Sequence, residues 1–596
     1  MRKVYVIKAI KPLNAQIFDL WINADGPERR YITVRGIIIN PKSKSNSISR
    51  EPGITTAVFL LTLLLFSSLL QAAPAGISLE QIRGQLQHAF QASSDGKTPA
   101  IELSQAERLH ALYLRRDYQA LWIGADGLST QANVLIEQIL NARQEGFEVD
   151  NYHLPRIRLL IDNGKVSATN AAELELLLSD ALFRLASDLY HGRFLPVELD
   201  PQWHIPLPEL QADERLVQAV EQAHVKEVIT GLTPYDSRYM ALRRALNHLR
   251  HIAAAGGWRA LPTGPTLRRG DRNQRVALLR ERLKISGDLT MEPLESADLF
   301  DDALDEAVRF FQSHHGLEVD GAVGAQTLKA MNISVEQRIT QVRVNLERWR
   351  WLPRNFGSRY ILVNMAGYEL ELNESGHLPL KMRVIVGKTY RQTPAFSGRL
   401  TYLVVNPTWT VPSVILKEDI FPQLRSNPNY LAQQKIRVFD SWKTDATEIS
   451  PAQVDWSRIT SRHSPYKFRQ DPGPGNALGS IKFMLNNPFD IYLHDTPKRE
   501  LFDRAVRAFS SGCIRLERPL ELAERLLNDN NAWNGAQLLD TIKSNVSKNV
   551  DLRQPVPIYF TYMTAWVDER GLLQLRPDVY ERDKAMAVAL FGAKVD

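Results

Sequence analysis

The 596-residue sequence predicts a multidomain α+β protein, in which a helical domain and a small three-helix domain precede a mainly-β domain that carries an insertion. Three observations support this fold class. Apolar residues recur at helical spacing through residues 76–260, and three shorter helix patterns occupy residues 261–331 behind a Pro/Gly-rich linker. Short alternating segments, typical of β-strands, begin near residue 359 and resume after a long interruption at residues 412–475. A chain of this length is expected to hold several domains.

Residues 1–75 are interpreted as a basic leader followed by a signal peptide. Residues 54–70 form an uncharged apolar run, and small residues that suit a cleavage site follow at positions 71–75. An uncleaved membrane anchor is the alternative. Positive charge before the run predicts that the rest of the chain lies outside the cytoplasm.

The charge distribution gives no indication of a nucleic-acid partner. Residues 1–53 contain ten Lys or Arg and four Asp or Glu, which accounts for the whole net charge of +6. The remainder holds 63 of each sign and is formally neutral. A nucleic-acid-binding domain would be expected to carry a basic excess of its own.

Residues 76–260 are predicted to form a helical domain without a catalytic site. Residues 174–189 form a strong amphipathic run that His191 and Gly192 end. An earlier helix face is marked by Leu103, Ala106, Leu109 and Leu112.

Residues 261–331 are predicted to form a compact three-helix unit. An Asp-Gly turn at Asp320 and Gly321 precedes a third helix that contains Thr327. The first two helix faces consist of Val276, Leu279 and Leu283, and of Ala303, Ala307, Phe310 and Phe311.

Residues 332–545 are predicted to form the mainly-β domain. It begins with a basic helix at residues 338–354, whose Arg343, Arg348 and Arg350 are expected to face solvent rather than to bind an anion. Ala366 and Gly367 mark a hairpin. The strands before the insertion are expected at residues 360–365, 368–372, 382–387 and 403–406.

The insertion at residues 412–475 is rich in aromatic residues and is predicted to be a lid or cap over a binding site, since long insertions in compact domains commonly are. The strand pattern resumes at residues 478–485. Residues 546–596 are assigned to a C-terminal strand and tail.

The candidate catalytic residues are Cys513, which is the only cysteine, and His494, nineteen residues before it. Residues 491–493 are expected to be a strand that delivers His494. A thiol is a poor nucleophile until a neighbouring imidazole removes its proton. Gly512 leaves room for substrate, and the N–H groups around Gly512 and Cys513 are candidates to face an oxyanion. From these residue types alone, a buried structural cysteine beside an unrelated histidine is an equal alternative.

His494-Asp495, followed by Ser510-Ser511-Gly512-Cys513-Ile514-Arg515, resembles the signature of YkuD-type L,D-transpeptidases. Ser511 stands where the commoner pattern has a second histidine. This departure resembles the large multidomain YcbB-like branch and leaves His494 as the base. The resemblance extends to residues 386–388, 393–394 and 406–409. It also identifies residues 76–260 as similar to the scaffold domain, residues 261–331 to a peptidoglycan-binding domain, and residues 412–475 to a capping subdomain.

The resemblance implies an exported cysteine L,D-transpeptidase that cross-links peptidoglycan in the periplasm or cell envelope, with stem peptides and the sacculus as partners. His494 would act as base and then as acid around a thioester on Cys513, without a cofactor or metal. Ser510, Ser511 and Gly512 are expected to orient His494 or to shape the oxyanion site. Tyr492, Arg515 and Trp409 are expected to bind substrate.

Three alternatives remain open at this point. An L,D-carboxypeptidase would pass the same acyl group to water, and a non-catalytic wall-binding protein would use residues 261–331 alone. A zinc site is the third alternative. It is disfavoured because His377, His463 and His494 are the only histidines after residue 331 and have no paired ligand spacing.

Overall fold

The computed structural model describes the backbone of three strands before residue 78 and most of the chain after it. The described ranges are residues 5–10, 16–22, 34–38, 78–94, 102–124, 126–162, 167–209, 213–291, 296–460, 462–530 and 532–592. Internal contacts divide the chain into two units, Met1–Ala72 and Ala73–Asp596. The predicted signal or anchor at residues 54–70 lies outside the described residues. Within the described part of the chain, the helices include none that combines the length and the apolar character needed to span a membrane.

The first unit contains a three-stranded antiparallel sheet with the order β1-β2-β3. Its strands are β1 (Tyr5–Ile10), β2 (Gln16–Ile22) and β3 (Val34–Ile38). The sequence analysis assigned this segment to a leader and predicted no sheet in it. Each strand contains isoleucine or valine at several positions, and these β-branched residues favour extended backbone.

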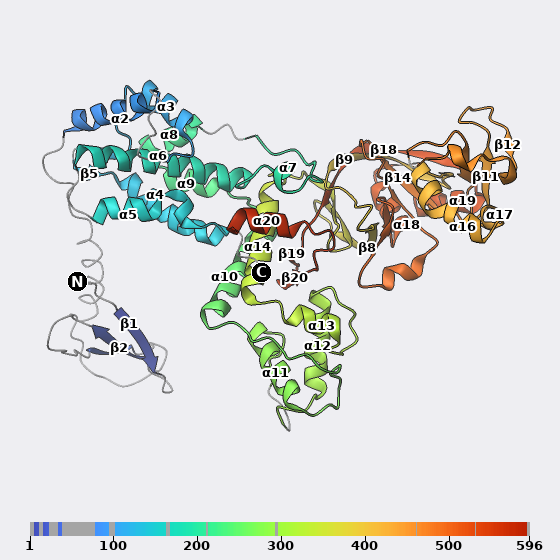
Figure 1. The fold of residues 1–596 in the computed structure, drawn as a ribbon, viewed down its shortest axis with the longest axis horizontal. Helices are drawn as coiled ribbons and strands as arrows, with labels where there is room; N and C mark the ends of the chain where they lie inside the picture. The colour runs from blue at the N-terminus through green and yellow to red at the C-terminus, as the bar shows by residue number, and fades with distance from the viewer. Residues whose placement is uncertain are drawn as a thin grey trace. The chain divides into compact units, whose positions relative to one another are not determined.

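The predicted helical domain is confirmed in residues 78–231. Its helices surround α6 (Ala168–His191), whose buried Leu174, Leu178 and Leu185 recur at helical spacing. Ser167 caps α6 by accepting a hydrogen bond from the N–H of Asn170. The other helices are α2 (Leu79–Ser94), α3 (Ala106–Arg115), α4 (Thr130–Asn141), α5 (Leu154–Asp162), α8 (Asp213–Glu221) and α9 (Val225–Gly231) (Figure 1).

Residues 261–331 form the predicted three-helix unit with a core of its own. The helices are α11 (Gln274–Ser286), α12 (Asp302–His314) and α13 (Ala325–Met331). The buried residues include Val276, Leu279, Leu283, Ala307 and Phe311. Phe310, which the sequence analysis placed on the same face as Phe311, is instead 41% exposed.

Arg348 and Arg350 of α14 (Val335–Arg350) are buried, so the prediction that they form a solvated face is wrong for these two, whereas Arg343 is half-buried. The side chains of Arg348 and Arg350 are 0% and 1% exposed, respectively. Arg348 Nη1 lies 2.5 Å from Asp583 Oδ1, and Arg350 Nη1 lies 2.9 Å from Glu347 Oε2. The sequence pattern missed this because the partner of Arg348 comes from α20 (Asp583–Phe591), far along the chain. Helix α10 (Ser237–Ala254) also packs against α14.

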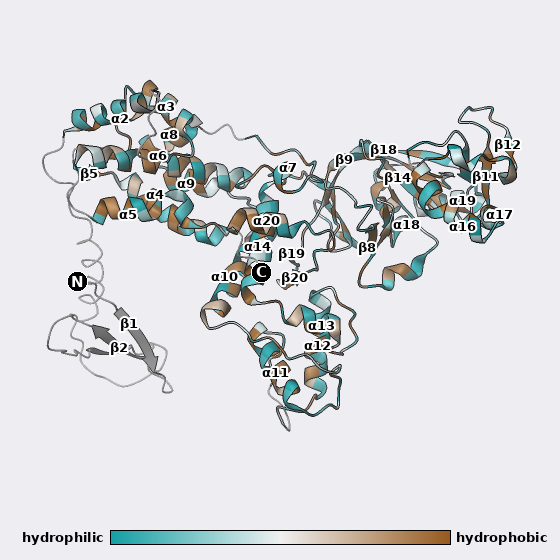
Figure 2. Ribbon diagram, viewed as in Figure 1, coloured by the Kyte–Doolittle hydropathy of each residue, from teal (hydrophilic) through white to brown (hydrophobic). Residues whose placement is uncertain are grey.

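The mainly-β domain is built on a nine-stranded mixed sheet with the order β16-β8-β17-β15-β14-β9-β18-β6-β7. Its apolar face belongs to a core shared with α14. The ribbon of these strands includes hydrophobic stretches, drawn in brown in Figure 2. The strands in chain order are β6 (Arg359–Asn364), β7 (Glu369–Glu374), β8 (Leu380–Gly387), β9 (Ser397–Val405), β14 (Ile481–Leu485), β15 (Leu493–His494), β16 (Ala508–Ser510), β17 (Ile514–Leu516) and β18 (Lys548–Thr561).

Strand β18 lies between β9 and β6, in the middle of this sheet. The sheet therefore extends past residue 545, where the sequence analysis placed the end of the domain. Other C-terminal elements pack against the same core. They are α18 (Pro519–Leu526), α19 (Gly535–Ser544), the pair β19 (Ala565–Val567) and β20 (Leu573–Leu575), and α20.

The insertion forms a subdomain with its own sheet, of order β10-β13-β11-β12, and its own core around Val411, Leu431 and Phe468. The inserted subdomain is thus confirmed, while its role as a cap stays a prediction. Its strands are β10 (Trp409–Thr410), β11 (Ile436–Phe439), β12 (Glu448–Ile449) and β13 (Lys467–Gln470). Its helices are α15 (Ser413–Ile415), the π-helix η3 (Leu416–Ile420), α16 (Phe421–Ser426) and α17 (Tyr430–Gln433).

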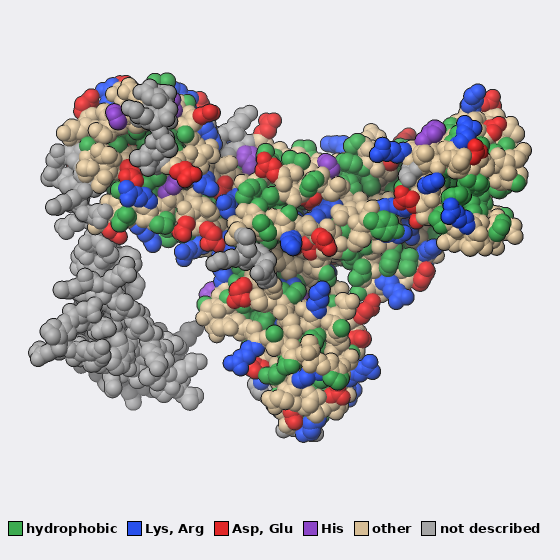
Figure 3. Space-filling model, viewed as in Figure 1, with side chains coloured by type: hydrophobic (Ala, Val, Ile, Leu, Met, Phe, Trp, Pro, Cys, Tyr) green, Lys and Arg blue, Asp and Glu red, His purple; other side chains and the backbone are tan. Residues whose placement is uncertain are grey.

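Charged side chains of both signs are interspersed on the face drawn in Figure 3. This agrees with the balanced charge of the chain after residue 53.

Candidate active site

Three adjacent strands place five candidate site residues on one face of the sheet. Lys482 of β14 is opposite His494 of β15, and His494 is opposite Arg515 of β17. Cys513 immediately precedes β17 and is level with Tyr492, since the N–H of Ile514 donates to the Tyr492 carbonyl at 3.1 Å. Because side chains alternate along a strand, Lys482, Tyr492, His494, Cys513 and Arg515 share a face. The opposite face is apolar and buried, with Ile481, Phe483, Leu493, Ile514 and Leu516.

His494 is buried as a neutral imidazole with one nitrogen available as a base. Its Nδ1 lies 2.5 Å from the backbone carbonyl of Asp495. A carbonyl oxygen can only accept, so Nδ1 carries the hydrogen and Nε2 keeps its lone pair. Burial, followed by the positive charges of Arg515 and Lys482, lowers the pKa of His494 to about 3. The imidazole is therefore uncharged at neutral pH.

Cys513 is half-buried and holds its proton at rest. Burial raises the pKa of its thiol and outweighs the hydrogen bonds from Tyr492 and the positive charges of Lys482 and Arg515. The thiol contacts the Asp490 carbonyl, with Sγ and O 3.7 Å apart. The resting pair therefore consists of a neutral thiol and a neutral imidazole, not a thiolate and an imidazolium.

The turn before Cys513 is held from two sides. Gly512 has φ +119, a conformation that L side chains rarely adopt, and a Cβ there would lie 3.3 Å from Ile491 Cδ1. The Gly512 N–H donates to Ser510 Oγ at 3.1 Å, and the buried Thr393 hydroxyl donates to the Gly512 carbonyl at 2.7 Å. The same Thr393 oxygen accepts from the N–H of Gly387 at 3.0 Å, which ties the turn to β8.

Ser511 is connected to the insertion through Arg391. Arg391 Nη1 donates to Ser511 Oγ at 2.8 Å and to Asp419 Oδ2 at 2.5 Å, while its Nη2 donates to Glu418 Oε2 at 2.6 Å. Glu418 and Asp419 belong to the π-helix η3 of the insertion. The Arg391 side chain is only 9% exposed, whereas the side chains of Asp419 and Glu418 are 34% and 43% exposed. Arg391 thus connects Ser511, in the turn before Cys513, to the insertion.

The three residues expected to bind substrate are placed differently. Tyr492 lies beside the catalytic pair, with its ring centroid 5.7 Å from that of His494, and Arg515 lies on the same face. Trp409 lies in β10 and packs against the core of the insertion. Its contact with substrate stays a prediction.

Lys482 is a candidate site residue that the sequence analysis missed. Its Nζ lies 3.8 Å from the Tyr492 ring centroid, and burial lowers the pKa of its ammonium group. The sequence does show that Lys482 is the charged residue in the otherwise apolar strand at residues 481–485. The structure adds that this strand pairs with the strand of His494.

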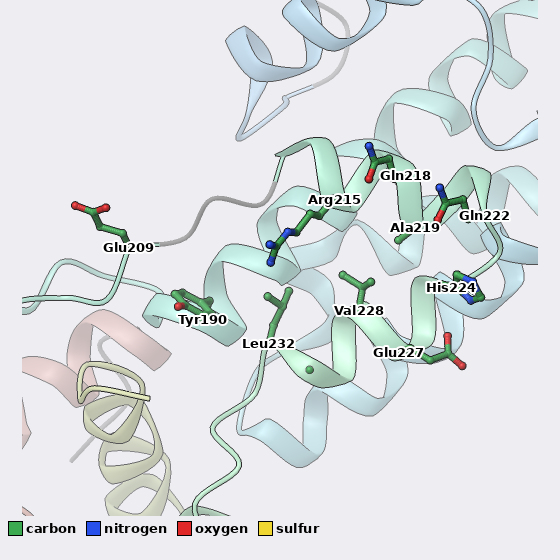
Figure 4. A pocket seen from close by; sticks show the side chains of 11 residues that line it. Tyr190, Glu209, Arg215, Gln218, Ala219, Gln222, His224, Glu227, Val228 and Leu232 are labelled. Carbon is green, nitrogen blue, oxygen red and sulfur yellow. The ribbon is translucent and has the colours of Figure 1, made fainter. Parts of the chain in front are cut away.

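Cavities of the described residues lie away from this face, and two of them are in the helical domain and beside the three-helix unit. One, of about 670 Å³, is in the helical domain between α8 and α9 and is lined by Tyr190, Arg215, Gln218, Glu227 and Val228 (Figure 4). The other, of about 490 Å³, is bounded by α10, α12 and the β19–β20 pair. Among the described residues, no group of three or more His, Cys, Asp or Glu side chains is placed to hold a metal ion.

The sequence matches three known domain families. Residues 107–246 match a scaffold domain, residues 272–331 a peptidoglycan binding domain, and residues 358–557 the YkuD L,D-transpeptidase catalytic domain. These matches confirm the resemblance that the Cys513 and His494 motifs indicated.

Two curated relatives match parts of the chain. A Haemophilus influenzae protein named "Putative L,D-transpeptidase" is 35% identical over 257 residues, which cover 43% of this chain and 51% of that protein. The chain thus spans about half the length of that relative. The N-acetylmuramoyl-L-alanine amidase CwlM of Mycobacterium tuberculosis is 44% identical over 75 residues, covering 11% of this chain and 18% of that protein.

Solved structures of L,D-transpeptidases also match. One from Xylanimonas cellulosilytica is 14% identical with a TM-score of 0.16, over 50% of this chain and 99% of that one. One from Mycobacterium smegmatis is 11% identical with a TM-score of 0.17, over 34% of this chain and 58% of that one. TM-scores this low support no argument about the fold.

Proposed function

Because residues 358–557 form a YkuD L,D-transpeptidase catalytic domain, we propose that this protein is a cysteine L,D-transpeptidase that cross-links peptidoglycan. The observation that carries the proposal is the face shared by His494 and Cys513, with His494 held as a neutral base by the Asp495 carbonyl. A structural cysteine would not require a buried histidine with an unprotonated Nε2 on the same face.

In the first half-reaction, His494 Nε2 takes the proton from the Cys513 thiol as the sulfur attacks a stem-peptide carbonyl. That carbonyl belongs to an L-centred diamino acid joined to D-alanine. The new S–C bond forms a tetrahedral oxyanion, for which the Cys513 N–H is the candidate donor, since the Gly512 N–H already donates to Ser510. The C–N bond then breaks, His494 protonates the leaving amine, and D-alanine departs from a Cys513 thioester.

In the second half-reaction, the side-chain amine of another stem attacks the thioester carbonyl. His494 accepts a proton from this amine, the C–S bond breaks, and the proton returns to the Cys513 sulfur. The thioester retains the energy of the original amide, so the exchange needs neither a nucleotide nor a metal. A pKa of about 3 for His494 means that the imidazolium is short-lived and passes its proton on readily.

The other domains fit a substrate that is part of a large wall polymer. Residues 272–331 match a peptidoglycan binding domain, which supports attachment of the enzyme to the sacculus. The contacts of Arg391 with the η3 helix and with Ser511 support a role of the insertion as a cap over the site. A wall substrate implies a location in the periplasm or cell envelope, with residues 54–70 as signal peptide or anchor.

Hydrolysis of the same thioester, which would make the protein an L,D-carboxypeptidase, is the second candidate. It uses the same residues and differs only in whether water or an amine reaches the thioester. The apolar core and aromatic residues of the insertion favour exclusion of water and therefore transfer to an amine.

The test is incubation of the purified protein with stem tetrapeptides, followed by mass spectrometry of the products. Cross-linked dimers with release of D-alanine are expected, together with a thioester adduct on the protein. The Cys513→Ala variant should form neither, while its thermal unfolding stays that of the wild type. Cross-linking by Cys513→Ala near the wild-type rate would refute the assignment, and tripeptide products alone would establish hydrolysis instead.

A further inference from the structure

Two cations flank the catalytic histidine in a single row across three strands. Lys482, His494 and Arg515 occupy matching register positions on β14, β15 and β17, and all three lie on the same face as Cys513. Neighbouring strands are about 4.8 Å apart, and Lys482 and Arg515 lie on the two strands that flank the strand of His494. Their side chains are therefore separated by roughly the span of one small anion and the hydrogen bonds that it accepts.

Neither cation has an acidic partner among the described residues. Arg515 Nε is buried and has no hydrogen-bond partner. The Lys482 ammonium lies over the ring of Tyr492, and Asp490 acts on it only at a distance, without an ion pair. By contrast, Arg391 and Arg383 in the same domain each pair with two carboxylates. Charged donors that are partly buried and unpaired are costly, and an anion that pairs with both would relieve that cost.

We propose that Lys482 and Arg515 together bind the α-carboxylate of the residue that leaves the donor stem, and so restrict the enzyme to stems whose leaving residue is the C-terminal one. This inference rests on the proposed function. His494 must protonate the leaving nitrogen, and in an α-amino acid the carboxylate is attached to the carbon bonded to that nitrogen. When the nitrogen faces His494 Nε2, the carboxylate therefore falls beside the row that His494 occupies.

The remaining groups on the face are consistent with this assignment. Tyr492 is held in its un-ionised form, because burial and the neighbouring Cys513 raise its pKa, so it adds no negative charge to the site. Arg515 and Lys482 both lower the pKa of His494. A carboxylate bound between them offsets that positive potential, so His494 becomes a stronger base when a correct donor is present.

The first test compares three donors with the wild-type protein: a stem tetrapeptide with a free C-terminal carboxylate, the same peptide as its C-terminal amide, and one amidated only on the side-chain carboxylate of the third residue. Release of the fourth residue is followed by mass spectrometry. The free acid is expected to exceed the C-terminal amide by roughly 10- to 100-fold in kcat/KM, mainly through KM. If activity depends instead on the side-chain carboxylate of the third residue, the assignment of the bound group as the C-terminal carboxylate is wrong.

Substitutions identify the residues responsible. Lys482→Met keeps the length of the side chain without its charge and should reduce the preference for acid over amide toward unity, whereas Lys482→Arg should restore it. Lys548→Met is a matched control, since Lys548 also lies over an aromatic ring, that of Trp533, at 4.8 Å. Its strand β18 pairs it with Val405, on the opposite face of the sheet. If Lys482→Met lowers kcat/KM equally for the acid and the amide donor, Lys482 has a merely structural role and the proposal is refuted.

A binding measurement separates failure of this inference from failure of the proposed function. N-acetyl-D-alanine should slow alkylation of Cys513 by iodoacetamide, while N-acetyl-D-alaninamide at equal concentration should not. This protection needs no turnover, and it should be lost in Lys482→Met and retained in Lys548→Met. Equal effects of the acid and the amide would refute the carboxylate site even in an active enzyme. Protection without any cross-linking or hydrolysis would support the site and refute the proposed function.

Discussion

Titration of Cys513 tests whether the catalytic pair is neutral at rest. Burial raises the pKa of the thiol above its ordinary value of 9.0, while His494 has a pKa of about 3. The difference between the two pKa values is at least about six units, which at 1.36 kcal/mol per unit corresponds to about 8 kcal/mol for moving the proton from sulfur to nitrogen. The attraction between the thiolate and the imidazolium formed beside it offsets part of this cost. A turnover of about 1 s⁻¹ corresponds to a barrier of about 17 kcal/mol. The transfer is thus affordable within a catalytic step, but the ion pair is not populated beforehand.

The assay is alkylation by iodoacetamide between pH 5 and pH 10, with the mass of the intact protein as readout. The single cysteine makes the adduct unambiguous. Thiolate forms as pH rises, so the rate should increase through a single midpoint above 9.0. At pH 7 the thiolate fraction should be below about 1%, compared with about 3% for a free cysteine of pKa 8.5.

Two variants complete this test. His494→Ala should leave the alkylation profile unchanged, because the imidazole is neutral over the whole range, although it should lower turnover by about 100- to 10,000-fold. Lys482→Met should move the midpoint upward, because a positive charge that favours the thiolate is lost. A plateau of fast alkylation between pH 5 and pH 8, abolished in His494→Ala, would demonstrate a preformed ion pair and refute the reasoning.

Three further predictions concern the parts around the pair. Replacing residues 412–475 with a short Gly/Ser linker should weaken stem-peptide affinity and raise the ratio of hydrolysis to cross-linking, since water gains access; unchanged affinity and product ratio in a folded deletion would exclude a cap. Residues 261–331, which have a core of their own, should co-sediment with purified sacculi when expressed alone, and absence from the pellet would favour a spacer role. Thr393→Val should destabilise the catalytic domain in urea by about 2–5 kcal/mol, because the Gly512 carbonyl and the Gly387 N–H both lose their partner. Thr393→Ser keeps the hydroxyl as a control, and a loss below about 0.5 kcal/mol in the valine variant would contradict this account.

Local sequence patterns were sufficient to predict those elements whose structure is determined by residues close together in the sequence. The alternation in residues 360–387 predicted β6, β7 and β8, because one buried face per strand imposes a period of two. The spacing of Val276, Leu279 and Leu283 predicted α11 for the corresponding reason. The motif around His494 and Cys513 was recognisable because it is short and rich in residues with specific chemistry.

Features that depend on pairing between distant segments could not be predicted. Register determines that Lys482 faces His494, and no local pattern states which strands are neighbours. The burial of Arg348 requires Asp583, more than two hundred positions later, and the basic helix was therefore interpreted as solvated. The central place of β18 was missed in the same way, because its partners are β9 and β6.

The ion pair between Arg348 and Asp583 also constrains how the protein is made. All strands of the nine-stranded sheet have been synthesised by residue 561, yet the guanidinium of Arg348, in the last turn of α14, lacks its ion-pair partner Asp583 until α20 leaves the ribosome. An unpaired buried charge costs about 3–5 kcal/mol, a large share of the stability of one domain. A nascent chain that stalls between these points would hold the nucleophile and the base in an incompletely stabilised sheet. Synthesis of α20 therefore marks the stage at which a polypeptide with a reactive thiol gains its full stability.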